Sequence, residues 1–236
     1  MDHLILKKSL SQKSSKSRAI VSRSFFKTAK GQYGEGDIFI GVSIPAIRLI
    51  AKKYALTPMS EIVKLIQSSI HEERSLGLIF LVNKFKIADL KERQKIHRLY
   101  LKYRKHINNW DLVDGSAPVL LGRHCFEIDS HQIMDRLLKS KRHWDRRMAI
   151  VGTLSFIKSG ETRLTFLYAQ NLLDDREDLM HKATGWMLRE AGKKDPQGLR
   201  IFIKEFGKRM PRTMLRYAIE KFSPAERSHI LKETKN

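Results

Sequence analysis

Helix signals follow one another along almost the whole chain, and small residues recur within them at nearly regular intervals. The small residues fall at Gly77, Ala117, Ala149, Ala183 and Ala218, so the successive intervals are 40, 32, 34 and 35 residues. Such spacing is typical of helix-pair repeats, in which each pair buries its apolar side against the next pair. The ordered Trp, Leu, Gly and Tyr signature of tetratricopeptide repeats is missing. The sequence therefore predicts an all-α, HEAT-like helical-repeat solenoid with a concave basic face.

Local signals place the helices of this fold. Pro45 and Pro58 each follow a Ser or Thr within two positions, which predicts two helix starts, and a capping box predicts another at Ser223. Apolar periodicity predicts further helices over 72–85, 89–103, 110–125, 130–138, 144–158, 161–173, 178–191, 197–209, 212–221 and 224–233. Alternating strand patterns are nearly missing outside 37–42.

The first residues have a different composition from the rest of the chain. Residues 1–23 combine several lysines and arginines with six serines, and a helical pattern develops only towards Phe25. We expect residues 1–24 to form a basic, partly flexible arm. Residues 25–236 are expected to form a single HEAT-like repeat domain.

A glycine-rich loop, GQYGEGDIFIGV, spans residues 31–42 and invites comparison with phosphate-binding loops. It has no GK[ST] ending and no third glycine opening a helix, which are the parts that phosphate chemistry requires. We therefore reject a nucleotide-binding role for this loop.

The charge balance points to a polyanionic partner. Lys and Arg number 46 against 25 acidic residues, which gives a formal net charge of +21 and an isoelectric point near 10.2. Nucleic acid is the first candidate for such a partner and an anionic membrane the second. Arg200, Lys204, Lys208, Arg212 and Arg216 recur every four residues, as suits a basic groove or a solvated helix face.

Other classes of protein are excluded by what the sequence lacks. The single Cys125 excludes an internal disulfide and a cysteine-based zinc site, and no metal or cofactor is implied. The apolar run 78–82 is too short to span a bilayer, and residues 1–10 lack the apolar stretch of a secretory signal. We expect a soluble, cytoplasmic monomer that does not bind membranes.

Each of the three tryptophans has a charged residue at helical spacing. The pairs are Trp110 with Asp114, Trp144 with Arg147, and Trp186 with Arg189. Residues three or four apart share one face of a helix, so each indole can lie beside a charge. The competing interpretation is that the indoles are core residues and the charges are solvated. The apolar surroundings of Trp144 favour packing for that residue.

The stretches around these pairs resemble a known family. NWDLVD at 109–114, WDRRMAI at 144–150 and KATGWMLRE at 182–190 are similar to the AlkD-type DNA glycosylases, which are HEAT-repeat proteins that excise alkylated purines. HEERSLGL at 71–78 and FIGVSIPAIR at 39–48 are similar too, and the resemblance covers most of residues 25–222.

The resemblance implies roles for individual residues. Asp114 falls on the family's catalytic aspartate, Trp110 and Trp186 on its active-site tryptophans, and Arg147 on an arginine that grips phosphate near the lesion. The further DNA-binding candidates in these stretches are Arg146, Trp144, Arg189 and Lys182.

The implied activity is hydrolysis of the glycosidic bond of positively charged N3- or N7-alkylpurines in double-stranded DNA, with the base left in the duplex. One alternative is a non-catalytic HEAT-repeat protein that recognises damaged or branched DNA. A second is a protein-interaction solenoid whose charge only keeps it soluble. A lyase acting through a lysine is also open in principle, although no single lysine stands out.

Overall fold

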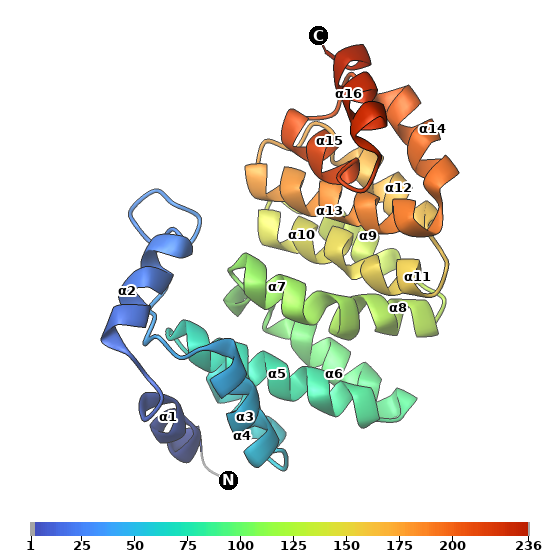
Figure 1. The fold of residues 1–236 in the computed structure, drawn as a ribbon. Helices are drawn as coiled ribbons and strands as arrows, with labels where there is room; N and C mark the ends of the chain where they lie inside the picture. Colours follow the sequence, from blue (N-terminus) through green and yellow to red (C-terminus); the bar gives the residue numbers. More distant parts are fainter. Residues whose placement is uncertain (1–2, 236) are drawn as a thin grey trace. The chain divides into compact units, whose positions relative to one another are not determined.

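The computed structural model describes residues 3–235 and contains two compact units, residues 1–116 and residues 117–236. Helices make up both units and most are joined by short turns, with a longer connection over residues 26–43 in the first unit (Figure 1). Within residues 3–235, extended pairing is limited to an isolated parallel bridge between Ile38 and Ile70. The predicted all-α helical-repeat class is confirmed. The single domain over 25–236 stays a prediction.

The first unit is built around one long and almost fully buried helix. Its helices are α1 (His3–Ser11), α2 (Lys16–Phe25), α3 (Ile44–Lys53), α4 (Met59–Ile66), α5 (His71–Ile87), α6 (Leu90–Lys102), a 3-10 turn (Arg104–His106) and α7 (Trp110–Ala117). Helices α1, α3, α4 and α6 all pack against α5. Gly77 allows α4 to pack closely on α5, because a Cβ atom at this position would lie 2.8 Å from Cγ1 of Ile66 on α4.

The predicted N-terminal arm is helical along most of its length. Leu6 and Leu10 of α1 are fully buried, and α2 begins at a cap in which the Ser15 side chain accepts the N–H of Arg18. The expectation that helix begins only towards Phe25 was therefore wrong. Two apolar residues four apart give α1 a buried stripe, which a composition rich in lysine and serine concealed.

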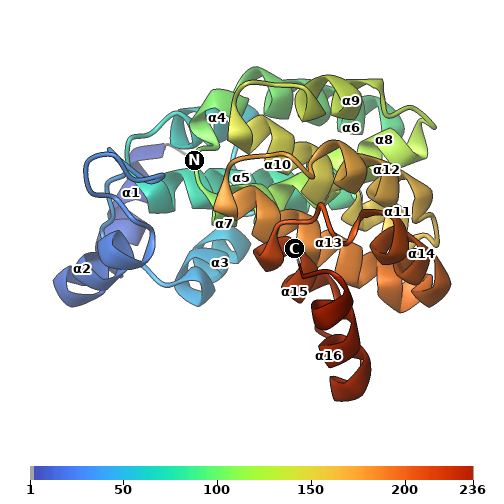
Figure 2. The ribbon, with the colours of Figure 1, turned by 90° about the horizontal axis from the view of Figure 1, so that it is seen from above.

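The second unit stacks its helices in successive layers. They are α8 (His124–Glu127), α9 (Gln132–Leu138), α10 (His143–Gly152), α11 (Leu154–Lys158), α12 (Arg163–Asn171), α13 (Asp178–Lys194), α14 (Pro196–Phe206), α15 (Arg212–Ala218) and α16 (Pro224–Glu233). Helix α13 packs against α10 on one side and α15 on the other. In Figure 2, α16 extends away from the rest of this unit, and none of its residues is fully buried.

Two predicted helices are interrupted in the structure. Residues 110–125, predicted as one helix, comprise α7, a π-helical segment (Pro118–Arg123) and the start of α8. Proline lacks the N–H that would continue α-helical bonding, which accounts for a change of helix type at Pro118. Residues 144–158 are divided at Thr153 into α10 and α11. The small residues that suggested a repeat, Gly77, Ala117, Ala149, Ala183 and Ala218, are all buried.

Gly122 carries the closest helix contact of the second unit and gives a stability prediction. A Cβ atom at this position would lie 1.9 Å from the carbonyl oxygen of Gly152 in α10, so Gly122→Ala must push two backbones apart. Overpacking of this kind costs about 1–3 kcal/mol, which corresponds to a fall in Tm of roughly 2–12 °C for a chain of this size. Thermal unfolding followed by circular dichroism measures it.

The matched control is Gly115→Ala on α7, where a Cβ atom would meet nothing within 4 Å. Alanine favours helix over glycine, so this variant should keep or slightly raise Tm. Equal Tm values for the two variants would contradict the close packing of Gly122 on Gly152.

Candidate active site

Trp110 and Asp114 occupy the first and fifth positions of α7 in the first unit. Both side chains are half-buried. Residues at this spacing lie on the same face of a helix, so the carboxylate and the indole stand one turn apart. The pairing predicted from the sequence therefore has the helical geometry that it requires.

The ring of Trp110 belongs to a cluster of aromatic side chains supplied by the N-terminal segment. Phe26 stacks on it with ring centres 5.3 Å apart and an interplanar angle of 27°. Phe25 approaches edge-on at 5.8 Å, and its side chain is 61% exposed. Phe26 also stacks on Phe39 at 4.9 Å. The two rings that directly follow the predicted arm thus contact the candidate active-site tryptophan.

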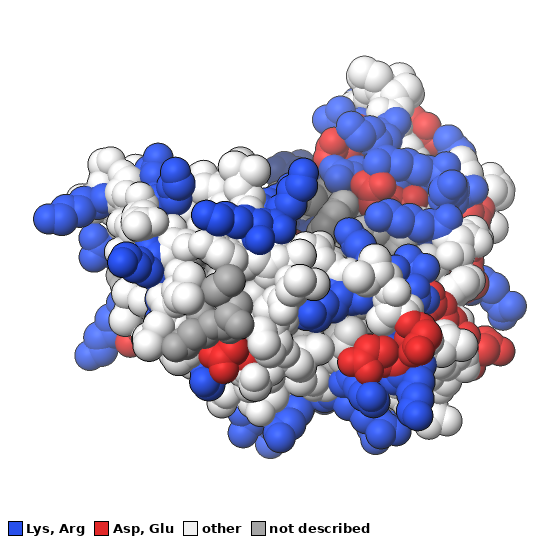
Figure 3. Space-filling model, turned by 90° about the horizontal axis from the view of Figure 1, so that it is seen from below, with Lys and Arg blue, Asp and Glu red and all other residues white. Residues whose placement is uncertain are grey.

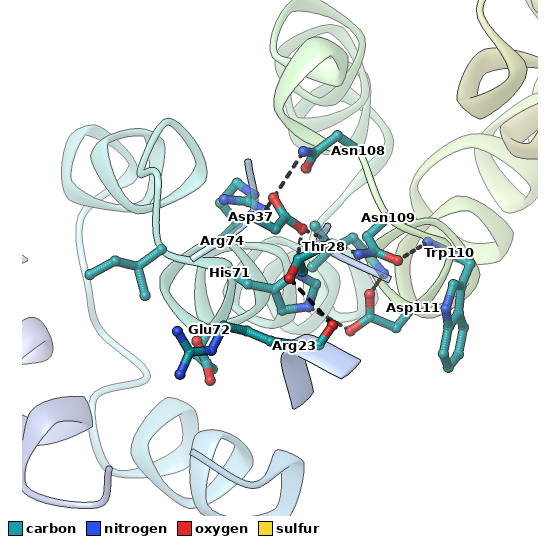
Figure 4. Close-up of polar contacts among 12 residues, drawn as sticks. Arg23, Thr28, Asp37, His71, Glu72, Arg74, Asn108, Asn109, Trp110 and Asp111 are labelled. Carbon is teal, nitrogen blue, oxygen red and sulfur yellow. Dashed lines mark hydrogen bonds and ion pairs between the residues drawn. The ribbon is translucent and has the colours of Figure 1, made fainter. Parts of the chain in front are cut away.

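The carboxylate of Asp37, in the same unit, accepts four hydrogen bonds (Figure 4). Its Oδ1 accepts from Arg74 at 2.6 Å and from Asn108 at 3.0 Å, and its Oδ2 accepts from His71 and Asn109 at 3.2 Å each. Burial opposes ionisation of Asp37, but the hydrogen bond from His71 and the charge of Arg74 outweigh it and lower the pKa to about 2. Asp37 is therefore a buried, fully ionised anchor.

His71, the first residue of α5, bridges two carboxylates. Its Nδ1 lies 3.2 Å from Oδ2 of Asp37, and its Nε2 lies 2.8 Å from Oδ2 of Asp111 on α7. Burial would lower the pKa of the imidazole, but the hydrogen bonds to Asp111 and Asp37 prevail and raise it. The ring is stacked against Phe39 at 4.4 Å.

The glycine-rich loop is held by Glu72, the next residue of α5. The Glu72 carboxylate accepts the backbone N–H groups of Ile40, Gly41 and Val42, the shortest bond being 2.7 Å from Gly41. Gly41 has φ +78°, and a Cβ atom there would lie 2.2 Å from the carbonyl oxygen of Ser15. The N–H groups at the end of this loop are therefore occupied by a carboxylate.

In the second unit, the WDRR stretch begins α10, and much of it is buried. Trp144 is 4% exposed, in line with the packing role that its apolar neighbours favoured. Arg147 is 5% exposed and donates a hydrogen bond to the carbonyl oxygen of Leu179 at 2.5 Å. Arg146 makes a two-pronged ion pair with Asp175, at 2.6 and 3.0 Å.

The other three predicted residues of this unit lie on α13. Trp186 is half-buried. Arg189 contacts Glu190 and Glu220, and Lys182 forms an ion pair with Asp178 at 2.7 Å. Helix α15 approaches closely beside the tryptophan, because a Cβ atom on Gly185 would lie 2.4 Å from the carbonyl oxygen of Met214.

Basic side chains cover much of the surface. Figure 3 shows Lys and Arg spread over the face that it draws, with Asp and Glu gathered in fewer places. The five basic residues that recur every four positions are all exposed: Arg200, Lys204, Lys208, Arg212 and Arg216. Arg200 pairs with Glu226 at 2.8 Å, so part of this charge is already compensated.

Within residues 3–235, no helix is long and apolar enough to cross a membrane. Nor does this range bring together three or more His, Cys, Asp or Glu side chains in a way that could hold a metal ion.

The sequence did not indicate the polar network around Asp37. Its members Asp37, His71, Arg74, Asn108, Asn109 and Asp111 come from three separate segments of the chain. The only available signals were a cluster of four charged or titratable residues at the start of an apolar helix, HEER, and the pair of asparagines before Trp110. Neither signal shows which residues pair.

Comparison with sequence models of protein families gives a match over most of the chain. The sequence model for a family described as "DNA alkylation repair enzyme" matches residues 6–222. A solved structure from Enterococcus faecalis, called a predicted DNA alkylation repair enzyme, is similar with a TM-score of 0.71 and 17% sequence identity. The similarity covers 90% of this chain and 98% of that one, and at this identity it shows the fold alone. No curated protein matches the sequence significantly.

Proposed function

The chain belongs to the family of DNA alkylation repair enzymes, and we propose that it is a monofunctional DNA glycosylase. Its substrate would be double-stranded DNA carrying positively charged N3- or N7-alkylated purines. The observation that carries the proposal is that Asp114 stands one helical turn from Trp110, whose ring is stacked on Phe26. An anion next to aromatic faces suits a reaction in which a sugar becomes positively charged.

The proposed reaction is hydrolysis of the bond between N9 of the purine and C1′ of deoxyribose. Alkylation at N3 or N7 makes the base cationic, so the bonding electrons neutralise it as it leaves and no general acid is needed. The sugar develops oxocarbenium character, which the carboxylate of Asp114 stabilises. Water then adds to C1′ and loses a proton, with Asp114 positioned to orient it. The products are the free base and an abasic site.

The electrostatic contribution of Asp114 is large enough for this role. Two opposite unit charges about 4 Å apart, at an effective dielectric constant near 20, attract by roughly 4 kcal/mol. A transition state stabilised by that amount is reached about a thousandfold faster. Trp110 and Trp186 would add about 0.5–2 kcal/mol through contact of a cationic sugar with an indole face.

The basic side chains are proposed to bind the DNA backbone. We assign phosphate contacts to Arg147, Arg146, Arg189 and Lys182 and leave Trp144 with a packing role. Because Arg147 is buried and bonded to Leu179, we expect Arg147→Ala to lower stability as well as DNA affinity. Arg146 and Arg189 already pair with the carboxylates of Asp175 and Glu220, so each arginine would have to bind phosphate alongside its carboxylate.

The wider setting follows from the same proposal. We propose HEAT-like repeats that present a concave basic face to the duplex, in a chain that works as a monomer. DNA binding would place the protein in the cytoplasm at the nucleoid. No cofactor or metal takes part in the proposed hydrolysis.

Duplex binding should weaken steeply as salt concentration rises. Each phosphate that a Lys or Arg neutralises releases condensed counterions, so the logarithm of affinity falls linearly with the logarithm of salt concentration. For about six such contacts, affinity drops roughly a thousandfold between 50 and 200 mM salt. Fluorescence anisotropy of a labelled duplex measures this slope. An affinity unchanged over that range would exclude a phosphate-binding role for the +21 net charge.

A duplex containing one N7-methylguanine separates the proposed glycosylase from its alternatives. The enzyme should leave an abasic site, detected with an aldehyde-reactive probe, in a strand that stays intact until alkali is added. A lyase would cut the strand directly. A non-catalytic HEAT-repeat protein that recognises damaged or branched DNA would bind the duplex tightly and leave no abasic site.

A further inference from the structure

We propose that His71 is a positioning residue: held as an imidazolium between Asp37 and Asp111, it fixes the start of α7 and so orients Trp110 and Asp114. The inference rests on the proposed function for its effect on catalysis. Its structural part, the coupling of His71 to Trp110, stands without it. His71 is two helices removed in sequence from α7, yet it contacts the residue that follows Trp110.

The hydrogen bonding defines the charge of the ring. Both nitrogens face carboxylate oxygens, at 3.2 Å for Asp37 and 2.8 Å for Asp111. A carboxylate accepts and does not donate when ionised, so both nitrogens must carry hydrogen. Asp37 cannot supply the proton itself, because Arg74 and two asparagines already donate to it.

Two connections lead from this centre to the first turn of α7. In one, Asp111 accepts from His71 through Oδ2 and from the backbone N–H of Leu112 through Oδ1, at 2.8 Å each. In the other, Asn109 donates to Asp37 at 3.2 Å, and its Oδ1 accepts the backbone N–H of Trp110 at 2.8 Å. Both connections join the backbone next to Trp110 to the hydrogen-bonded group formed by Asp37, His71 and Asp111.

The aromatic rings add a third connection. Phe26 lies 5.1 Å from the His71 ring and 5.3 Å from the Trp110 ring, centre to centre. A cation near an aromatic face gains electrostatic attraction, so the imidazolium also holds the ring that stacks on Trp110. A neutral ring would weaken the contacts to Asp37, Asp111 and Phe26 together.

The charged groups that act most strongly on His71 are Asp37 from the segment after α2, Asp111 from α7, and Arg74 one turn along α5. The neighbouring acids point elsewhere: Glu72 binds the backbone of residues 40–42, and Glu73 pairs with Lys7. Two anions against one cation leave the surroundings net negative, which favours the protonated ring.

The direction of the pH dependence follows. The pKa of His71 is raised in the folded protein, so its stabilising contribution is fully present below the ordinary value near 6.5 and is lost as pH rises through the raised value. Excision should therefore be fastest below the pKa of His71 and fall as pH rises through it. His71 touches none of the reacting atoms, so its loss should lower kcat and leave DNA affinity nearly unchanged.

Nuclear magnetic resonance on the 236-residue chain tests the coupling independently of activity. The imidazole signals of His71 should titrate above the ordinary range. The ¹⁹F signal of 5-fluorotryptophan at Trp110, assigned with Trp110→Phe, should shift with the same midpoint. In His71→Gln that shift should vanish. In His131→Gln, which removes an exposed histidine paired with Asp135, it should persist.

Single-turnover excision supplies the second readout. His71→Gln should lose between about ten- and a hundredfold in rate at neutral pH, with its pH profile flattened above the parental midpoint. If His71→Gln fails to fold, Asp111→Asn takes its place. This variant keeps the shape of the side chain, and it should lower both the pKa of His71 and the rate of excision. A Trp110 signal that ignores the titration of His71, or a His71 ring that is neutral at pH 7, overturns the proposal. If the parental protein excised no base but its Trp110 signal still followed the titration of His71, only the glycosylase assignment would be refuted.

Discussion

With asparagine in place of Asp114, single-turnover excision of N7-methylguanine should slow by about a thousandfold, while affinity for undamaged duplex stays within about threefold. Asparagine keeps the size of the side chain and removes its negative charge, so the loss is specific to stabilisation of the positively charged sugar. An effect on the rate with little effect on binding identifies an interaction that is stronger in the transition state. Rapid-quench assays with enzyme in excess over DNA measure the rate directly.

Asp174→Asn is the matched control, because it removes the same charge from an exposed site where Asp174 pairs only with Arg209 at 3.1 Å. It should excise at the parental rate. If Asp114→Asn also kept the parental rate, the carboxylate would have no part in the chemistry and the assignment of Asp114 would fail.

A second large effect concerns which lesions are removed. We expect release of N3- and N7-alkylpurines and no measurable release of uracil or hypoxanthine from matched duplexes. A cationic base leaves as a neutral molecule, whereas an uncharged base must be protonated or stabilised as an anion when it departs. Asp111, the nearest other carboxylate on α7, is already bonded to His71 and is not placed as a proton donor to the base.

Duplexes that differ only in one base pair provide the comparison, with abasic sites quantified after equal incubation. Because selection depends on charge, the size of the alkyl group should matter less than its position. Uracil excised as fast as N7-methylguanine would refute selection by lesion charge and would require a pocket that reads the edge of a flipped base.

Much of the fold could be predicted because its causes are local. Helix periodicity, proline positions and capping residues act within one turn, and the caps at Asp89 and Ser223 accept the expected N–H groups of Glu92 and Glu226. The π-helical segment at 118–123 was not predicted, because Pro118 signals a missing N–H without showing whether the helix ends, kinks or changes type there. The buried leucines of α1 were hidden by the charged and polar residues around them.

The candidate site was predictable to a smaller extent. The placement of Trp110 and Asp114 on one helix follows from a spacing of four residues, which sequence shows directly. The bridge from His71 to Asp111 joins residues 40 apart, and that from His71 to Asp37 joins residues 34 apart. Such pairs depend on how α5, α7 and the loop pack, so single-sequence reasoning cannot choose them. The same limit applies to Arg147, whose burial no local pattern indicated.

Chromatography of the bases released from methylated duplex DNA tests the glycosylase assignment most directly. DNA treated with a methylating agent is incubated with the purified protein, the polymer is removed, and the free bases are separated and identified. The parental protein should release N3-methyladenine and N7-methylguanine well above the spontaneous rate, and Asp114→Asn should release them at close to that rate. Tight, salt-sensitive binding to the same DNA without any released base would contradict a glycosylase and leave a DNA-binding protein.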